Sequence, residues 1–192
     1  YVKEYSTNEH YLISEETYPV VFEYGGEDTA VVEIVVNDGD AILNEIIRGS
    51  ISGIKVDENG EPLPGAVFGL FKADCTEFTE ETAVRITESD STGKFRFEDI
   101  RYGKWIIREL KPATGYVLNK TPIEVEITED GKTVFITIEN KFIRGDIKGY
   151  KVDEDGKSVV GALFGLFTED DTEFTEEKAV LTAVSDADGI FI

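Results

Sequence analysis

The chain has 192 residues, with forty acidic and nineteen basic side chains, and its formal net charge at pH 7 is −21. A negative field of this size repels phosphate backbones and anionic headgroups. We therefore expect the protein neither to bind nucleic acid nor to insert into a membrane. One cysteine and one histidine rule out an internal disulfide and a Cys/His metal site and argue against a Ser-His-Asp hydrolase, so no metal and no cofactor are expected.

An internal repeat organises the sequence. Residues 47–96 and 143–192 align without a gap at an offset of 96, and 29 of the 50 aligned positions are identical. The repeat predicts the C-terminal half of one domain at 1–48, a complete domain at 49–141, and the N-terminal half of a third domain at 142–192. Since no signal peptide opens the chain and Tyr1 falls inside an expected strand, we expect the sequence to be a fragment.

The complete segment reads as a series of short strands. Apolar residues alternate with a period of two between turn-forming residues, which predicts strands at 51–57, 66–73, 82–88, 94–98, 104–111, 122–128 and 133–140. Only Thr76 to Glu81 suggests a turn of helix. Seven short strands of this kind predict an all-β fold of tandem antiparallel Greek-key β-sandwiches, of the prealbumin or immunoglobulin type.

Three polar residues end the inward-facing series on three of these strands. Lys55 follows Ile51 and Gly53, Glu109 follows Trp105 and Ile107, and Asn140 follows Val134, Ile136 and Ile138. A buried charge is costly, so Lys55 is expected to lose its proton and become a nucleophilic amine, while Glu109 is expected to be protonated. The chemistry that fits is attack of Lys55 on the carboxamide of Asn140, with Glu109 polarising it and carrying protons as ammonia leaves.

The chain resembles a known family in three segments: GIKVDENGEPLPGAVFGLF (53–71), GKFRFEDIRYGKWIIRELKPATGY (93–116) and FITIENK (135–141). They are similar to the Cna protein B-type, or SpaA-like, domains of Gram-positive surface adhesins and pilins, which have a prealbumin-like fold. The resemblance implies a Lys–Asn isopeptide bond between Lys55 and Asn140, with Glu109 as its catalyst.

The incomplete segments follow the same scheme. The third supplies Lys151 as a cross-linking residue, and the first supplies Glu4 as a catalytic residue. Two asparagines compete for the partner position of the first segment. Asn44 lies five residues before Gly49, as Asn140 lies five before Gly145, whereas an alignment of prolines chooses Asn37; we favour Asn44.

The function expected from the sequence is structural, not enzymatic beyond a single autocatalytic turnover. The protein is predicted to be a secreted stalk module of a surface adhesin on the bacterial cell wall, with neighbouring repeat domains as partners. An alternative is direct binding of a host matrix protein or glycan, for which Tyr102, Tyr116 and Tyr150 are the visible aromatic candidates. The complementary terminal halves also suggest head-to-tail self-association, in which Lys151 of one chain attacks Asn44 of the next.

Overall fold

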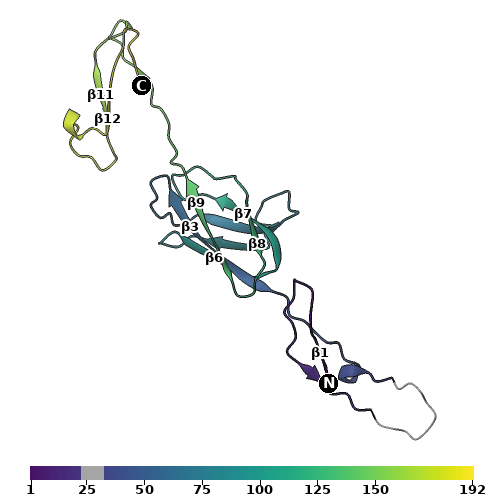
Figure 1. Ribbon diagram of the computed structural model, residues 1–192. Helices are drawn as coiled ribbons and strands as arrows, with labels where there is room; N and C mark the ends of the chain where they lie inside the picture. The colour runs from purple at the N-terminus through teal and green to yellow at the C-terminus, as the bar shows by residue number, and fades with distance from the viewer. Residues whose placement is uncertain (23–32) are drawn as a thin grey trace. The chain divides into compact units, whose positions relative to one another are not determined.

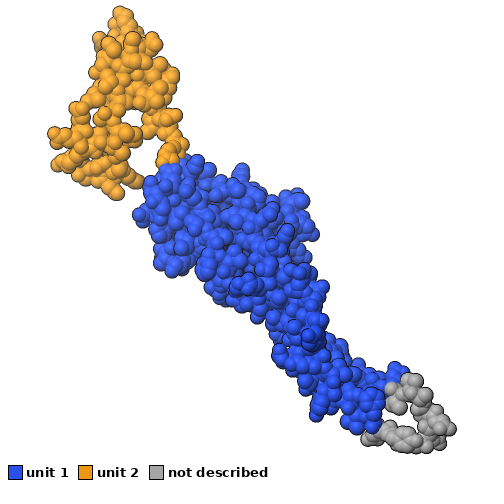
Figure 2. All heavy atoms as spheres, in the orientation of Figure 1, with its two compact units in different colours: residues 1–143 blue, residues 144–192 orange. Residues whose placement is uncertain are grey.

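The computed structural model describes residues 1–22 and 33–192 (Figure 1). The chain divides into two compact units, residues 1–143 and residues 144–192, which Figure 2 colours separately. Within the described residues, no helix is both long and apolar enough to cross a membrane. Each unit is described by itself below.

Residues 49–141 form two facing sheets, to which the strands labelled β3, β6, β7, β8 and β9 in Figure 1 belong. One sheet has the order β6-β3-β9 and the other the order β5-β4-β7-β8. Their bounds are β3 Arg48–Asp57, β4 Val67–Lys72, β5 Arg85–Glu88, β6 Lys94–Arg101, β7 Gly103–Lys111, β8 Ile123–Ile127 and β9 Thr133–Asn140. Every strand expected from the alternation is present, and the all-β fold class is confirmed.

The first and last strands of this domain lie side by side. β3 pairs with β6 antiparallel and with β9 parallel, so Lys55 stands opposite Ile138 and Asp57 opposite Asn140. Gly53 allows close packing at the centre of β3, because a Cβ atom there would lie 2.0 Å from the ring of Phe95. The core between the sheets consists of apolar residues from both: Ile51, Ala66, Phe68, Leu70, Phe95, Phe97, Ile100, Ile107, Val125, Ile127 and Ile138.

The expected turn of helix at 76–81 is a single turn and not a helix. The N–H of Ala83 donates to the carbonyl of Thr79 at 3.1 Å, and the Thr82 hydroxyl donates to the carbonyl of Glu77 at 2.6 Å. Threonine hydroxyls that bond to nearby backbone compete with helical hydrogen bonds, which explains why the turn does not continue. The loop still packs, since Phe78 meets Phe71 edge-on at 5.0 Å.

In residues 1–22 and 33–47, the structure has the elements β1 Val2–Lys3, β2 Thr17–Tyr18 and the 3-10 helix η1 Val36–Gly39. The isolated bridge between Tyr11 and Ile46 nevertheless resembles the bridge between Tyr116 and Phe142. The first residues of the two bridges are 105 positions apart and the second residues 96 positions apart, so the first segment has a longer stretch between them.

Residues 144–192 repeat the first half of the complete domain with shorter strands. The elements are β10 Gly149–Tyr150, β11 Leu163–Leu166, η2 Glu176–Lys178, β12 Leu181–Val184 and β13 Ile190–Phe191. β12 has the length of its counterpart β5, but β10 covers two residues where β3 covers ten. β3 is held along its length by β9, and residues 144–192 contain no segment equivalent to β9.

Candidate functional site: a buried lysine, glutamate and asparagine

The structure brings Lys55, Glu109 and Asn140 into the interior of the complete domain. Lys55 on β3 and Asn140 on β9 come from one sheet, and Glu109 on β7 comes from the other. Their exposed fractions are 0%, 3% and 1%. The Nδ2 of Asn140 donates to both carboxylate oxygens of Glu109, at 3.0 and 3.1 Å, so a polar bond spans the space between the sheets.

The strand register places the two cross-linking candidates on one face. Lys55 and Asp57 point inward on β3, and Ile138 and Asn140 point inward on β9, because side chains two apart on a strand share a face. Since Lys55 is level with Ile138 in the parallel pair, Asn140 is its diagonal neighbour one step further along. A lysine side chain is long enough to cover such a diagonal.

The buried environment of Lys55 disfavours the charged form of its side chain. Its Nζ donates to the backbone carbonyls of Val56 at 3.0 Å and Ile138 at 3.1 Å, and no carboxylate contact within ion-pair distance is recorded for it in the described part of the chain. Burial lowers the pKa of Lys55 from 10.5 to about 8, although the negative charges of Glu109, Glu139 and Asp57 oppose this. A substantial fraction of the amine is therefore neutral near physiological pH.

The pKa of Glu109 is shifted in the opposite direction to that of Lys55. Burial raises the pKa of Glu109 above its usual 4.5, against the lowering effects of the Asn119 N–H, the Asn140 amide and the charge of Lys55. The Asn119 N–H bond is short, 2.6 Å to Oε2, and the Asn119 side chain donates to the carbonyl of Glu139 at 3.0 Å. Sequence reasoning missed Asn119, because a backbone donor ten residues from its acceptor has no side-chain signature.

Asn140 contains the one buried side-chain polar atom in the described residues that has no hydrogen-bond partner, its Oδ1. An unpaired carbonyl oxygen in an apolar interior costs free energy, roughly 1–3 kcal/mol for a neutral group. Such an atom is the one on which negative charge would develop if a nucleophile attacked the carboxamide carbon.

The first segment contains a matching pair without a lysine. Asn44 Nδ2 lies 2.8 Å from each carboxylate oxygen of Glu4, and it also contacts Thr7 Oγ1 at 3.1 Å and the carbonyl of Leu12 at 3.0 Å. The N–H of Ser14, ten residues after Glu4, donates to that carboxylate at 2.6 Å, as Asn119 does to Glu109. These hydrogen bonds lower the pKa of Glu4, the Ser14 N–H most strongly.

The alternative asparagine lies elsewhere. Asn37 belongs to η1, where its Nδ2 donates to the carbonyl of Asp40 at 3.2 Å and its backbone has a φ of 57°. The site geometry of the first segment is thus formed by Asn44 and Glu4. Lys151 of the second unit is exposed, and its Nζ donates only to the carbonyl of Val152 at 3.3 Å among the hydrogen bonds recorded for the described residues.

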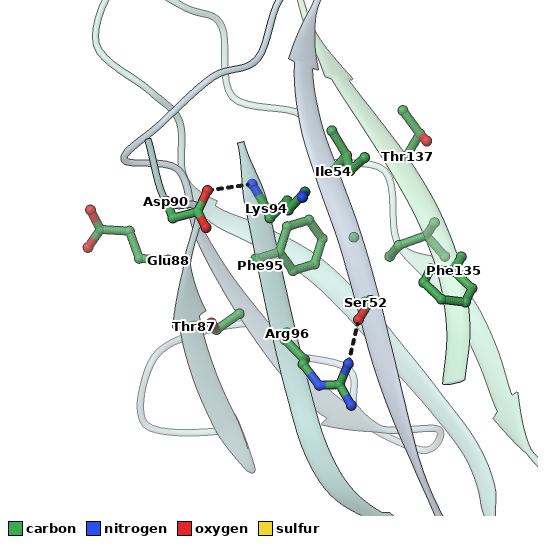
Figure 3. A pocket seen from close by; sticks show the side chains of 12 residues that line it. Ser52, Ile54, Thr87, Glu88, Asp90, Lys94, Phe95, Arg96, Phe135 and Thr137 are labelled. Atoms are coloured by element: carbon green, nitrogen blue, oxygen red, sulfur yellow. Dashed lines mark hydrogen bonds between the residues drawn. The ribbon is translucent and has the colours of Figure 1, made fainter. Parts of the chain in front are cut away.

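A separate groove lies on the outer face of the β6-β3-β9 sheet (Figure 3). It is lined by Ser52 and Ile54 of β3, Lys94 and Arg96 of β6, and Phe135 and Thr137 of β9, with Glu88 and Asp90 at one side. Phe135 is 79% exposed, which is unusual for a phenylalanine on a well-formed strand.

The three tyrosines considered as ligand contacts differ in their surroundings. Tyr102 stacks on His10 at 4.2 Å, and Tyr116 packs on Phe142 at 4.9 Å. Tyr150 remains 67% exposed, with Lys148 Nζ 5.3 Å from its ring centre. No cluster of three or more His, Cys, Asp or Glu residues suited to a metal occurs in the part of the chain that the structure describes.

The chain is similar to solved structures of several bacterial proteins, among them pilin subunits. The Bacillus anthracis TIE protein matches with a TM-score of 0.67 and 25% identity, over 98% of this chain and 32% of that protein. Weaker likenesses are BcpA*(D312A), the major pilin subunit of Bacillus cereus (TM-score 0.43, 29% identity, 48% of this chain and 28% of that one), and GBS52, the minor pilin of Streptococcus agalactiae (0.45, 27%, 69% and 60%).

The chain thus spans about a third of the TIE protein. No curated protein is similar to it in sequence. Residues 49–142 match the family described as SpaA, a prealbumin-like fold domain, and these bounds enclose both sheets and all three buried polar residues. The chain therefore carries, over residues 49–142, a SpaA-family domain with the prealbumin-like fold.

Proposed function

We propose that residues 49–141 are a structural module of a secreted bacterial surface protein, and that an amide bond between Lys55 and Asn140 locks the module. The observation that supports this most directly is the enclosure of Lys55 next to a carboxamide that is held by Glu109. A buried ion pair between Lys55 and Glu109 does not explain the site, because Lys55 donates to backbone carbonyls and not to the Glu109 carboxylate.

The proposed reaction is balanced within the three side chains. The neutral Nζ of Lys55 attacks the Cγ of Asn140 to form a C–N bond, the Cγ–Nδ2 bond breaks, and ammonia leaves. Protonated Glu109 donates to the carboxamide, and a half-turn of that group brings the unpaired Oδ1 to the carboxyl proton. Glu109 then takes the proton from the attacking amine and delivers it to the leaving nitrogen. The product is a neutral amide, which removes the cost of burying a charge.

The position of the bond suits a protein under tension. The neighbouring repeats are attached to the complete domain through the start of β3 and the end of β9, and the bond would join these same two strands. A pulling force would then pass from β3 to β9 through the bond, and the residues between 55 and 140 would not be stretched. This is the property that a stalk module of a pilin or adhesin requires, and it needs no substrate, metal or cofactor.

The test is the intact mass of the purified chain. Attack of an amine on a carboxamide releases ammonia, so we expect a loss of about 17 Da. Lys55→Ala and Glu109→Ala should restore the full mass, while Lys151→Ala, the equivalent change in the repeat, should keep the loss. Tandem mass spectrometry should then locate the bond in a branched peptide that contains Lys55 and Asn140. A folded wild-type chain of full mass would contradict the proposal.

The same chemistry supports a proposal for the terminal segments. Glu4 and Asn44 form a site without a lysine, and Lys151 stands on a segment without its own glutamate or asparagine partner. We propose that residues 144–192 of one copy dock on residues 1–48 of another, giving head-to-tail assembly in which Lys151 attacks Asn44. The groove between β11, β12 and β13, lined by Ile147, Phe164, Leu166 and Phe191, supplies the apolar surface for docking.

Head-to-tail joining is tested on a denaturing gel with concentrated protein. A ladder of covalent species in the wild type should disappear in both Lys151→Ala and Asn44→Ala, whereas Asn37→Ala should keep the ladder. A single band together with a monomeric mass by light scattering would exclude this assembly and leave the Lys55–Asn140 proposal untouched.

A second candidate function is supported by the groove of Figure 3. Exposed Phe135 and Ile54 offer an apolar surface, and Lys94 and Arg96 lie on the neighbouring strand, which suits a host glycan or matrix protein with acidic groups. Binding to arrays of acidic glycans and to immobilised matrix proteins should weaken in Phe135→Ala and Arg96→Ala. Equal binding by the wild type and both variants would contradict a binding function of this groove, and only the structural function would remain.

A further inference from the structure

The complete domain meets the segment before it through backbone hydrogen bonds at the crossing point of the chain. The carbonyl of Ile47 accepts from the N–H of Tyr102 at 2.8 Å, and the carbonyl of Arg48 accepts from the N–H of Gly131 at 2.7 Å. The N–H of Arg48 donates to the side chain of Asp130 at 3.0 Å. The side chain of Ile47 also packs against the core of the complete domain. The linker is therefore part of the domain surface and is not a free connector.

The same linker is tied to the first segment. The N–H of Ile47 donates to the carbonyl of His10 at 2.9 Å, directly beside the bridge between Tyr11 and Ile46. Residue 47 thus bonds through its N–H to one segment and through its carbonyl to the next. A rotation of one segment about the linker would break bonds on one side or the other.

Two side-chain contacts reinforce this arrangement. The ring of His10, the single histidine of the chain, lies over the ring of Tyr102 with centroids 4.2 Å apart and planes tilted by 32°. Arg48 pairs with Asp99 at 2.8 Å, and Asp99 has a φ of 55°, in the left-handed region that a non-glycine residue adopts at some cost. The ring contact acts across the junction, whereas the ion pair lies within the complete domain and fixes the start of β3.

The next junction along the chain repeats the backbone bond but not the ring. Gly115 is the equivalent of His10 at the offset of 105, and its carbonyl accepts from the N–H of Ile143 at 2.9 Å. A glycine has no side chain with which to contact a following domain. The backbone bond of the turn is therefore kept in the complete domain, and the position of the His10 ring is occupied there by a glycine.

We propose that the end of the complete domain formed by Asp99, Tyr102 and Asp130 is a docking surface for the repeat that precedes it. The partner it fits is a repeat whose turn presents a planar ring at the position of His10. The identity of this residue then sets how firmly two consecutive repeats are held together, independently of any covalent bond inside either one.

The test uses the full chain and measures hydrogen exchange at the amides of Ile47, which donates to His10, and Tyr102, which donates to Ile47. His10→Gly converts this junction to the type found at Gly115, and both amides should exchange about two- to tenfold faster, the range expected for loss of one stacked ring pair. His10→Phe keeps a ring and should retain the slow exchange. Tyr5→Ala removes a ring that is 96% exposed in the same segment and serves as the matched control.

Residual dipolar couplings give an independent measurement of the junction. In the wild type, residues 1–22 and the complete domain should fit one alignment tensor, and in His10→Gly they should require two. Unchanged exchange and couplings in His10→Gly would overturn the proposal. Equal effects of Tyr5→Ala and His10→Gly would also overturn it, because they would show a general loosening of the first segment and not a docking contact.

Discussion

Lys55 and Lys151 stand at equivalent positions of a repeat that is identical at 29 of 50 residues, and the two side chains have different environments. Both donate to the carbonyl of the following valine, at 3.0 and 3.3 Å, so the local backbone geometry is shared. Lys55 is completely buried and has a lowered pKa, whereas Lys151 is exposed. The repeat sequence therefore specifies the strand and the turn, but burial depends on strands that lie elsewhere in the chain.

The apolar positions show the same contrast. Ile51 is completely buried in the complete domain, and its equivalent Ile147 is 60% exposed. In contrast, Ser89 and Ser185 are both buried, and each donates to a carbonyl and accepts from an alanine N–H within its own half of the repeat. The serine hydrogen bonds form entirely within the repeated sequence, so they occur in both regions. Burial of Ile51 and Lys55 also requires β7 and β9, so it occurs only in the complete domain.

The largest expected effect concerns the two lysines. Lys55→Ala removes the proposed cross-link, which would close a loop of 140 − 55 = 85 residues and which a chain-entropy estimate values at about 4–5 kcal/mol of unfolding free energy. The melting temperature of the complete domain should therefore fall by many degrees. Lys151→Ala, the matched change at an exposed site, should leave that transition in place. Calorimetry of both variants distinguishes them, and equal melting temperatures would rule out a stabilising bond.

A second comparison tests the apolar core. Ile51→Ala deletes a buried side chain between the two sheets and should cost about 2–5 kcal/mol of unfolding free energy. Ile147→Ala changes the equivalent but largely exposed residue, and the expected effect is within about 0.5 kcal/mol. Urea unfolding followed by the fluorescence of Trp105 reports on the complete domain. A large effect of Ile147→Ala on this transition would contradict the expected difference between the two positions.

The third prediction uses the pKa of Lys55. In the double variant Glu109→Gln/Asn140→Ala no bond forms and the lysine keeps its amine. With Glu109 present its pKa in the fold is about 8, below the 10.5 of the unfolded chain, and loss of the Glu109 charge, which raises that pKa, lowers it further, so the unfolded state binds more protons over this range. Stability should therefore rise as the pH increases toward 10.5, by roughly 3 kcal/mol between pH 8 and 10.5.

Melting curves recorded across this pH range provide the measurement. The wild type serves as the control, because Lys55 in the proposed amide cannot titrate, so the rise should be missing. Adding Lys55→Met to the double variant should abolish the rise too. A rise of equal size in that triple variant would assign the pH dependence to another group.

The smallest expected effect tests what the two regions share. Ser89→Ala removes a hydroxyl that donates to Leu63 at 2.8 Å and accepts from Ala66 at 3.0 Å, at a cost of about 1–2 kcal/mol. Ser185→Ala removes the same pair of bonds, to Val159 and from Ala162. Hydrogen exchange at the two alanine amides should accelerate by a similar factor in each variant. Acceleration at Ala66 alone would show that the front half of the repeat is not independently formed.

The sequence by itself determined the strands, their inward faces and three of the residues that meet. Alternation with a period of two is a local property, so it located β3 to β9 and placed Lys55, Glu109 and Asn140 on buried faces before any tertiary contact was known. It also identified Glu4, whose carboxylate contacts Asn44.

Only the tertiary structure decided which of these residues are enclosed and what holds them. The backbone N–H groups of Asn119 and Ser14 bind the two glutamates, and backbone donors carry no sequence signal. The exposure of Lys151 follows from strands that are not its neighbours along the chain. Pairing between distant strands and the removal of water from a site are properties of the assembled sheets, and a local pattern does not contain them.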